Sequence, residues 1–185
     1  MLSRPAPARW RLVVAVVLAA GLSACGGHGG TPSAESSASL SPADQLVSTG
    51  LSQLKSGDTT AAKATFASAL ALDPKNVYAL FDLGLIAQDA ADPATAKTYY
   101  EAALASQPDY APALYNEAIV LERTDLGKSV ALYQHATRAD PTMAAAYIRL
   151  GFALAHLGKT DQAAAARAKG LALDPTLASA PTPSY

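Results

Sequence analysis

The segment VYALFDLGLIAQDAADPATAKTYYEAALASQPDY, residues 77–110, recurs in altered form before and after itself. The recurrence is clearest at a proline near the end of each copy, which stands at Pro74, Pro108, Pro141 and Pro175. Alignment on these prolines gives four successive segments, 43–76, 77–110, 111–143 and 144–177. A fixed period of this length is typical of helical-repeat proteins.

The four segments also agree at internal positions. The eighth position is small in every copy: Gly50, Gly84, Ala118 and Gly151. The fourth position is large in every copy: Leu46, Leu80, Leu114 and Tyr147. An aromatic residue follows in the second half of three copies, and arginine replaces it in the last: Phe66, Tyr100, Tyr133 and Arg167. Small residues at fixed places allow two helices to approach closely, and large ones between them fill the space to the next copy.

This pattern resembles the tetratricopeptide repeat, and the resemblance covers residues 43–177. It implies an all-α fold, an α-solenoid of about four helical hairpins stacked in a right-handed superhelix. Composition agrees, because half of the residues are hydrophobic but only 6% are aromatic. Much of the remaining hydrophobic content is alanine, which favours helices that pack on helices.

Capping residues mark the expected helix ends. Ser41, Asp58 and Asp92 are predicted to cap helix N-termini, with Pro42 and Pro93 at the first helical positions. Three glycines are predicted to follow first helices in the left-handed conformation: Gly57, Gly127 and Gly158.

Two residues depart from the repeat pattern. Glu117 stands at a position that is leucine in two other copies, where the short third turn would rotate the register. Arg167 replaces the aromatic residue of the last repeat, where a charge would keep an uncovered end soluble. Residues 178–185, ASAPTPSY, are predicted to be a disordered tail.

The first 25 residues have the organisation of a secretory signal. Three arginines without an acid precede the apolar run LVVAVVLAAGL, residues 12–22, which is too short to span a bilayer comfortably. Leu22-Ser23-Ala24-Cys25 resembles the lipobox of bacterial lipoproteins, which implies lipidation of Cys25 and removal of what precedes it. The alternatives are an ordinary signal cleaved elsewhere, or an uncleaved anchor with a free thiol at Cys25.

Residues 26–42, GGHGGTPSAESSASLSP, are predicted to be a flexible tether because Gly, Ser and Pro dominate. The expected location is therefore outside the cytoplasm. The protein would be lipid-anchored to the bacterial cell membrane, or to the outer membrane if the cell has two.

In the tetratricopeptide family the first helices of the repeats line a groove that binds partners. Carried over to this chain, that implies a mostly apolar groove made by Val47, Leu51, Tyr78, Phe81, Leu85, Tyr115, Asn116, Ile119, Ile148, Arg149 and Phe152. Phe81 and Tyr115 are the leading contact candidates, with completion of the inner packing as the alternative. The Lys and Asn with which some relatives grip a carboxylate are absent, so an apolar protein or peptide segment is the expected partner.

Nucleic acid is not expected as a partner, because the chain after Cys25 has 15 acidic and only 11 basic residues. The sequence contains no zinc-binding, phosphate-binding or nucleophile motif, and its acidic residues are scattered. We therefore expect no enzyme activity, no cofactor and no metal site. His28, His135 and His156 are interpreted as ordinary solvated residues.

Three functions fit these observations. The leading hypothesis is a membrane-anchored scaffold or adaptor that binds a partner segment during assembly of an envelope complex. The alternative is a carrier or chaperone for a lipid or a hydrophobic export substrate. Self-association through the uncapped last repeat is also open.

Overall fold

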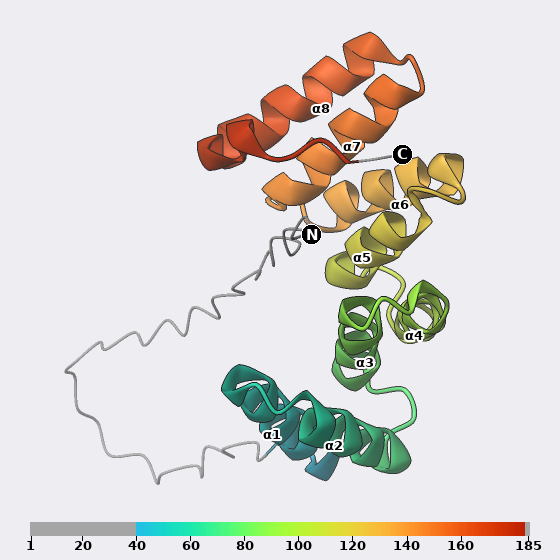
Figure 1. Ribbon diagram of the computed structural model, residues 1–185, viewed down its shortest axis with the longest axis vertical. Helices are drawn as coiled ribbons and strands as arrows, with labels where there is room; N and C mark the ends of the chain where they lie inside the picture. The colour runs from blue at the N-terminus through green and yellow to red at the C-terminus, as the bar shows by residue number, and fades with distance from the viewer. Residues whose placement is uncertain (1–39, 184–185) are drawn as a thin grey trace, which may run out of the picture. The chain divides into compact units, whose positions relative to one another are not determined.

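The computed structural model describes residues 40–183, and within this range the chain is helical. Eight α-helices follow one another in pairs, and a short 3-10 helix ends the series (Figure 1): α1 (Pro42–Ser56), α2 (Thr59–Leu72), α3 (Val77–Asp89), α4 (Pro93–Ser106), α5 (Ala111–Leu121), α6 (Leu126–Ala139), α7 (Ala144–His156), α8 (Thr160–Leu173) and η1 (Pro175–Ser179). The predicted signal segment, Cys25 and nearly all of the tether lie outside the described residues.

Each odd-numbered helix packs against the even-numbered helix that follows it, and each even-numbered helix then packs against the next pair. The elements thus form four helical hairpins, each in contact with its neighbours in chain order. This arrangement confirms the predicted all-α solenoid of helical hairpins. Among the described residues, none of the helices is both long enough and apolar enough to cross a membrane.

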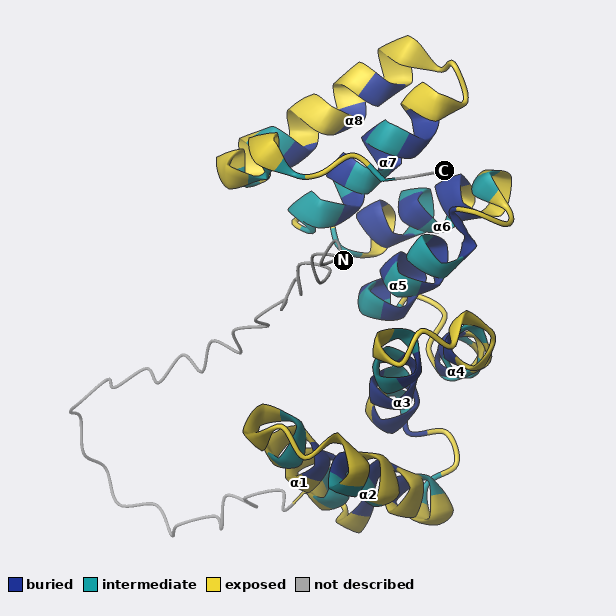
Figure 2. Cartoon of the chain, viewed as in Figure 1, coloured by how far each residue is buried: buried dark blue, intermediate teal, exposed yellow. Residues whose placement is uncertain are grey.

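The core runs between the helices as three clusters, and Figure 2 shows the buried residues concentrated on facing helix sides. The aromatic residues Phe66, Tyr100 and Tyr133 are fully buried at the centres of the first three hairpins. Most of α8 is exposed, since no further hairpin follows it among the described residues (Figure 2).

Side-chain caps hold the starts of the helices. Ser41, Asp58 and Asp92 each accept a hydrogen bond from the backbone N–H three residues on, which confirms the three predicted N-caps. Asn76 caps α3 in the same way through the Ala79 N–H. The Asn76 amide also donates to the Asp44 carboxylate at 3.0 Å, so this cap ties the first hairpin to the second.

Two of the three glycines predicted to be left-handed are so, and the third, Gly127, is not. Gly57 and Gly158 have φ values of 87° and 74°. Gly127 instead lies inside α6, after the cap Asp125, so its predicted role was wrong. Residues 122–125 connect α5 to α6, and none of them has a positive φ. The corresponding left-handed position in the second hairpin is occupied by Ala91, at φ 59°.

The two departures from the repeat pattern have physical explanations. Glu117 keeps its core position at 1% exposure, so the register is not rotated, and Lys128 Nζ lies 3.0 Å from its carboxylate. The apolar stem of Arg167 lies against Gly151, where the other hairpins place a ring, and its guanidinium lies 5.0 Å from the Phe152 ring centroid. At the end of the chain, residues 178 and 179 still belong to η1, which Asp174 caps, so the predicted disorder does not begin at residue 178.

Ala91 carries a backbone strain that glycine would relieve. Ala91→Gly should raise the free energy of unfolding by about 0.5–1 kcal/mol, since an alanine in the left-handed region costs roughly 1–2 kcal/mol and the added chain entropy offsets part of the gain. Urea unfolding followed by circular dichroism measures the difference.

Gly57→Ala is the matched control, because a Cβ at Gly57 meets no atom within 4 Å and the change tests backbone conformation alone. It should lower the unfolding free energy by about 1 kcal/mol. Equal or reversed effects of the two substitutions would contradict the explanation.

Candidate partner-binding face

The predicted groove residues lie on the first helices of the hairpins, α1, α3, α5 and α7, and we call their solvent-directed side the first-helix face. The structure divides them into three groups by exposure. Leu51 and Tyr78 are the open ones, with 47% and 54% of their surface exposed. The half-buried residues are Phe81, Leu85, Asn116, Ile119, Arg149 and Phe152. The buried residues are Val47, Tyr115 and Ile148.

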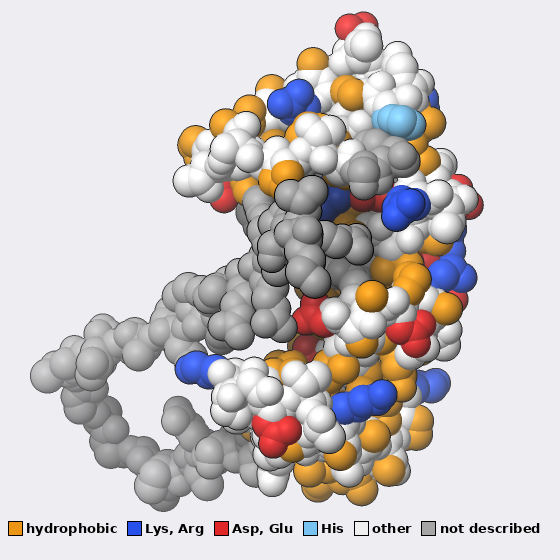
Figure 3. Space-filling model, in the orientation of Figure 1, with side chains coloured by type: hydrophobic (Ala, Val, Ile, Leu, Met, Phe, Trp, Pro, Cys, Tyr) orange, Lys and Arg blue, Asp and Glu red, His pale blue; other side chains and the backbone are white. Residues whose placement is uncertain are grey.

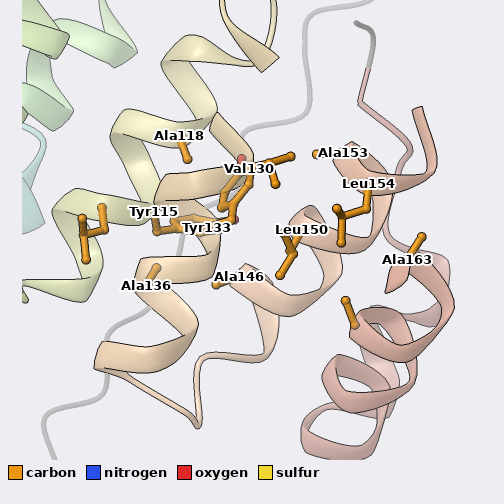
Figure 4. Packing of buried hydrophobic residues seen from close by; sticks show 12 residues of the cluster. Tyr115, Ala118, Val130, Tyr133, Ala136, Ala146, Leu150, Ala153, Leu154 and Ala163 are labelled. Carbon is orange, nitrogen blue, oxygen red and sulfur yellow. The ribbon is translucent and has the colours of Figure 1, made fainter. Parts of the chain in front are cut away.

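The buried group belongs to the core and offers a partner almost no surface. Tyr115 is 8% exposed, and its ring centroid lies 5.8 Å from that of Tyr133 inside the cluster shown in Figure 4. Val47 and Ile148 are 6% and 4% exposed, and Ile148 lies against Gly170 of α8. For these three residues the packing alternative holds, and the sequence prediction of partner contact is not supported by their positions.

Arg149 and Asn116 are largely occupied within the chain. Arg149 Nη1 donates to both oxygens of Glu122, at 2.8 and 3.1 Å, and the Tyr133 hydroxyl donates to the same carboxylate at 2.7 Å. This network joins the third hairpin to the fourth. The Asn116 amide nitrogen donates to the Pro112 carbonyl one turn earlier, at 2.8 Å. Sequence reasoning missed Glu122, although its position one turn after Ala118 places it beside the small-residue contact.

An aromatic cluster occupies the first-helix face at the second hairpin. The Tyr110 ring meets Tyr78 and Phe81 edge to face, at centroid distances of 5.9 and 5.4 Å. Phe81 also lies 5.9 Å from Tyr100, the buried ring of this hairpin. Edge-to-face rings at such distances stabilise one another beyond the area that they bury. The cluster therefore holds the half-buried Phe81 and the exposed Tyr78 in fixed positions. On the visible side of the molecule, hydrophobic side chains gather over the first and second hairpins (Figure 3).

Tyr110 was not among the predicted site residues. It is the last residue of the second repeat and precedes α5, so a search confined to first helices passes over it. Burial raises the pKa of its hydroxyl, and the nearby charge of Asp82 adds to the shift.

Asp82 is the third residue that sequence reasoning missed. It is 7% exposed and has no hydrogen bond or ion pair within residues 40–183. Loss of hydration raises the pKa of its carboxyl to about 7. The spacing from Tyr78 to Asp82 to Leu85 is one helical stripe, and this spacing is the signal that would have found it.

The exposed and half-buried side chains of this face are mostly aliphatic and aromatic. No group of three or more His, Cys, Asp or Glu side chains in the described part of the chain is arranged to hold a metal ion. His135 contacts Asp109 at 2.7 Å beside Arg138 and Ala139, at a shallow and mostly exposed site. Four hairpins that present a face of aliphatic and aromatic side chains define a helical-repeat protein of the kind that binds other proteins.

Comparisons with known proteins agree with this class. The tetratricopeptide repeat family model matches residues 48–90 and 81–127. Curated proteins give no match. A crystal structure of MamA superposes with a TM-score of 0.61 at 25% identity, covering 68% of this chain and 74% of that one. Residues 48–127 thus consist of tetratricopeptide repeats.

Two further solved structures share the fold. Pseudomonas aeruginosa pilF matches with a TM-score of 0.65 at 27% identity, covering 72% of this chain and 61% of its own. A Thermobaculum terrenum O-GlcNAc transferase matches with a TM-score of 0.56 at 27% identity, covering 60% of this chain but only 22% of the transferase. The chain thus spans less than two thirds of pilF and a small part of the enzyme.

The raised pKa of Asp82 makes folding stability depend on pH. An unfolded Asp has a pKa of about 4, so Asp82 imposes no penalty below that pH, and the penalty grows until the folded carboxyl has ionised above about pH 7. Tyr100 and Tyr110 do not titrate in this range, because their pKa values are raised above 10. Asp82→Asn should therefore be more stable than the parent by about 2–4 kcal/mol at pH 8, and by much less near pH 4.

Urea unfolding at a series of pH values measures this difference. Asp89→Asn is the control, because Asp89 ends the same helix in an exposed position. A difference between Asp82→Asn and the parent that stays constant from pH 4 to pH 8 would show that Asp82 ionises normally in the folded protein.

Proposed function

We propose that this chain is an exported, lipid-anchored adaptor that binds a segment of another protein on its first-helix face, in the assembly of an envelope complex. Proteins of this family bind protein partners along the surface formed by successive repeats. The anchor would fix the location of the adaptor, and the face would select the partner.

One observation carries the binding part of the proposal. Leu51 on α1 and Tyr78 on α3 leave about half of their surface uncovered, and half-buried Phe81, Leu85, Ile119 and Phe152 continue the stripe. Burial of apolar surface contributes about 25 cal/mol per Å², so a segment that covers several of these side chains gains affinity from each. Rigid aromatic anchors lose little conformational entropy on binding, which favours the end of the face that carries the aromatic cluster.

The proposal also has a physical basis at the other end of the chain. Cys25 follows an apolar run and two small residues, and several acyl chains on one residue would hold the protein at a membrane, since each buried methylene contributes roughly 0.8 kcal/mol. The 17 residues that follow would let the repeats turn freely at a short distance from the surface.

A photo-reactive phenylalanine analogue at Tyr78 should form a covalent adduct with a partner protein in the native cell. The matched control is the same analogue at Leu72, which is 60% exposed but lies on the second helix of its hairpin. Mass spectrometry of the adducts identifies what was captured.

The outcomes separate the hypotheses. A protein adduct at Tyr78 and none at Leu72 supports the adaptor. An adduct with a lipid would favour the carrier alternative, and one with a second copy of this chain would favour self-association. Equal yields at the two positions would contradict a binding role for the first-helix face.

Substitution of Cys25 tests the anchor separately. Cys25→Ala should shift the protein from the membrane fraction to the soluble fraction, or leave it unprocessed, because the thiol is the site of acylation. Fractionation with labelled palmitate follows both events, and the parent protein is the control. A Cys25→Ala protein that still takes up the label would contradict the lipidation assignment.

A further inference from the structure

Asp82 differs from the other buried carboxylates of residues 40–183 in having no cation. Glu117 and Glu122 are also buried, but Lys128 lies 3.0 Å from Glu117 and Arg149 lies 2.8 Å from Glu122. A buried carboxylate without a counter-charge lowers stability, because it loses hydration and gains no interaction in return. Two of the three buried carboxylates thus have a cation within the chain. The unpaired carboxylate of Asp82 is suited to bind a ligand.

The surroundings of Asp82 are aromatic. Residues 78, 81, 82 and 85 follow the spacing of one helical stripe, so Asp82 shares its side of α3 with Tyr78, Phe81 and Leu85. Tyr110 completes the group from the next hairpin, with its ring in contact with both Tyr78 and Phe81. The charge of Asp82 also adds to the raised pKa of the Tyr100 and Tyr110 hydroxyls, after the larger effect of burial.

A carboxylate beside several aromatic rings recognises a cation. The faces of tyrosine and phenylalanine attract Lys and Arg through their negative quadrupole, and a carboxylate accepts a charge-assisted hydrogen bond from the same group. An anion would be repelled. A purely apolar ligand would remove the remaining hydration of Asp82 without replacing it, at a cost in affinity.

The tether and the first two hairpins contain few basic residues. The predicted tether, residues 26–42, contains no Lys or Arg. Residues 43–110 carry eight acidic and only four basic residues, and one of those four, Lys97, is paired with Glu101. The first two hairpins thus have an excess of negative charge that would attract a basic segment.

We propose that Asp82, with Tyr78, Phe81 and Tyr110, forms a site for an arginine or lysine side chain of the partner segment. Apolar residues of the same segment then cover Leu85 and the neighbouring aliphatic side chains. This inference rests on the proposed adaptor function and names the chemistry of its partner: a protein segment that places a basic residue beside apolar ones.

Selection from a phage-displayed library of short random peptides, with the full chain in detergent as bait, tests the proposal. Peptides selected by the parent protein should be enriched in Arg or Lys next to apolar residues. In the best peptide, replacement of the arginine by citrulline, which keeps the shape and removes the charge, should weaken binding about tenfold. Asp82→Asn should weaken binding of the arginine peptide to the same extent.

The two changes should not add, because they remove the same interaction: citrulline should bring no further loss in the Asp82→Asn protein. Asp89→Asn is the control for general charge, since Asp89 lies on the same helix but is exposed, and it should keep the preference for arginine. Tyr110→Leu keeps the site apolar without its aromatic face, and it should reduce the preference several-fold. Circular dichroism confirms that each variant is folded.

The results distinguish this inference from the function on which it rests. Apolar peptides that bind the parent and Asp82→Asn equally, with no enrichment of basic residues, would overturn the cation site and leave the adaptor in place. An arginine preference that survives Asp82→Asn but is lost in Asp89→Asn would show diffuse attraction and would also overturn it. Selection of no peptide by any of the proteins would count against both.

Discussion

The first two hairpins depend on the approach of a buried ring on the second helix to a glycine on the first. A Cβ at Gly84 would lie 2.5 Å from the Tyr100 ring, and one at Gly50 would lie 2.6 Å from the Phe66 ring. Such distances are well inside van der Waals contact, so even one added methyl group would force the helices apart. The ring fills the space that the glycine leaves, and this contact sets the distance between the two helices of the pair.

The same contact decides which residues remain for function. Because one side of each first helix is committed to the second helix of its hairpin and another to the neighbouring hairpin, only a narrow stripe is left for solvent. Val47, Tyr115 and Ile148 turn into the core from the edge of that stripe, whereas Leu51 and Tyr78 stay outside it. The three buried residues share the fifth repeat position, whereas Leu51 and Tyr78 stand at the ninth and second, so places on one helical stripe differ in burial.

The repeat period, the hairpins and three N-caps were predictable because each follows from local spacing and from residues with one dominant role. The turns were less predictable. A glycine at residue 127 looks like a helix terminator but lies in the first turn of α6, and an alanine at residue 91 takes the left-handed conformation. The candidate site was predicted only in outline. Exposure of Tyr115 depends on how α5, α6 and α7 meet, and the role of Tyr110 depends on its approach to α3 from the next hairpin.

The ion-pair partners of buried carboxylates are the feature that local sequence spacing predicts least. Glu117, Glu122 and Asp82 all interrupt apolar helices, and nothing near them in the sequence says which has a partner. The partners of the first two, Lys128 and Arg149, lie 11 and 27 residues further on. The pairing of α5 with α6 brings Lys128 close to Glu117, and the stacking of the fourth hairpin on the third brings Arg149 close to Glu122. Because a buried carboxylate is tolerated when a cation lies beside it, the first two join helices together. The third has no cation and shares its side of α3 with Tyr78, Phe81 and Leu85. The same physical requirement that makes Glu117 and Glu122 structural therefore makes Asp82 receptive to a charge from outside the fold.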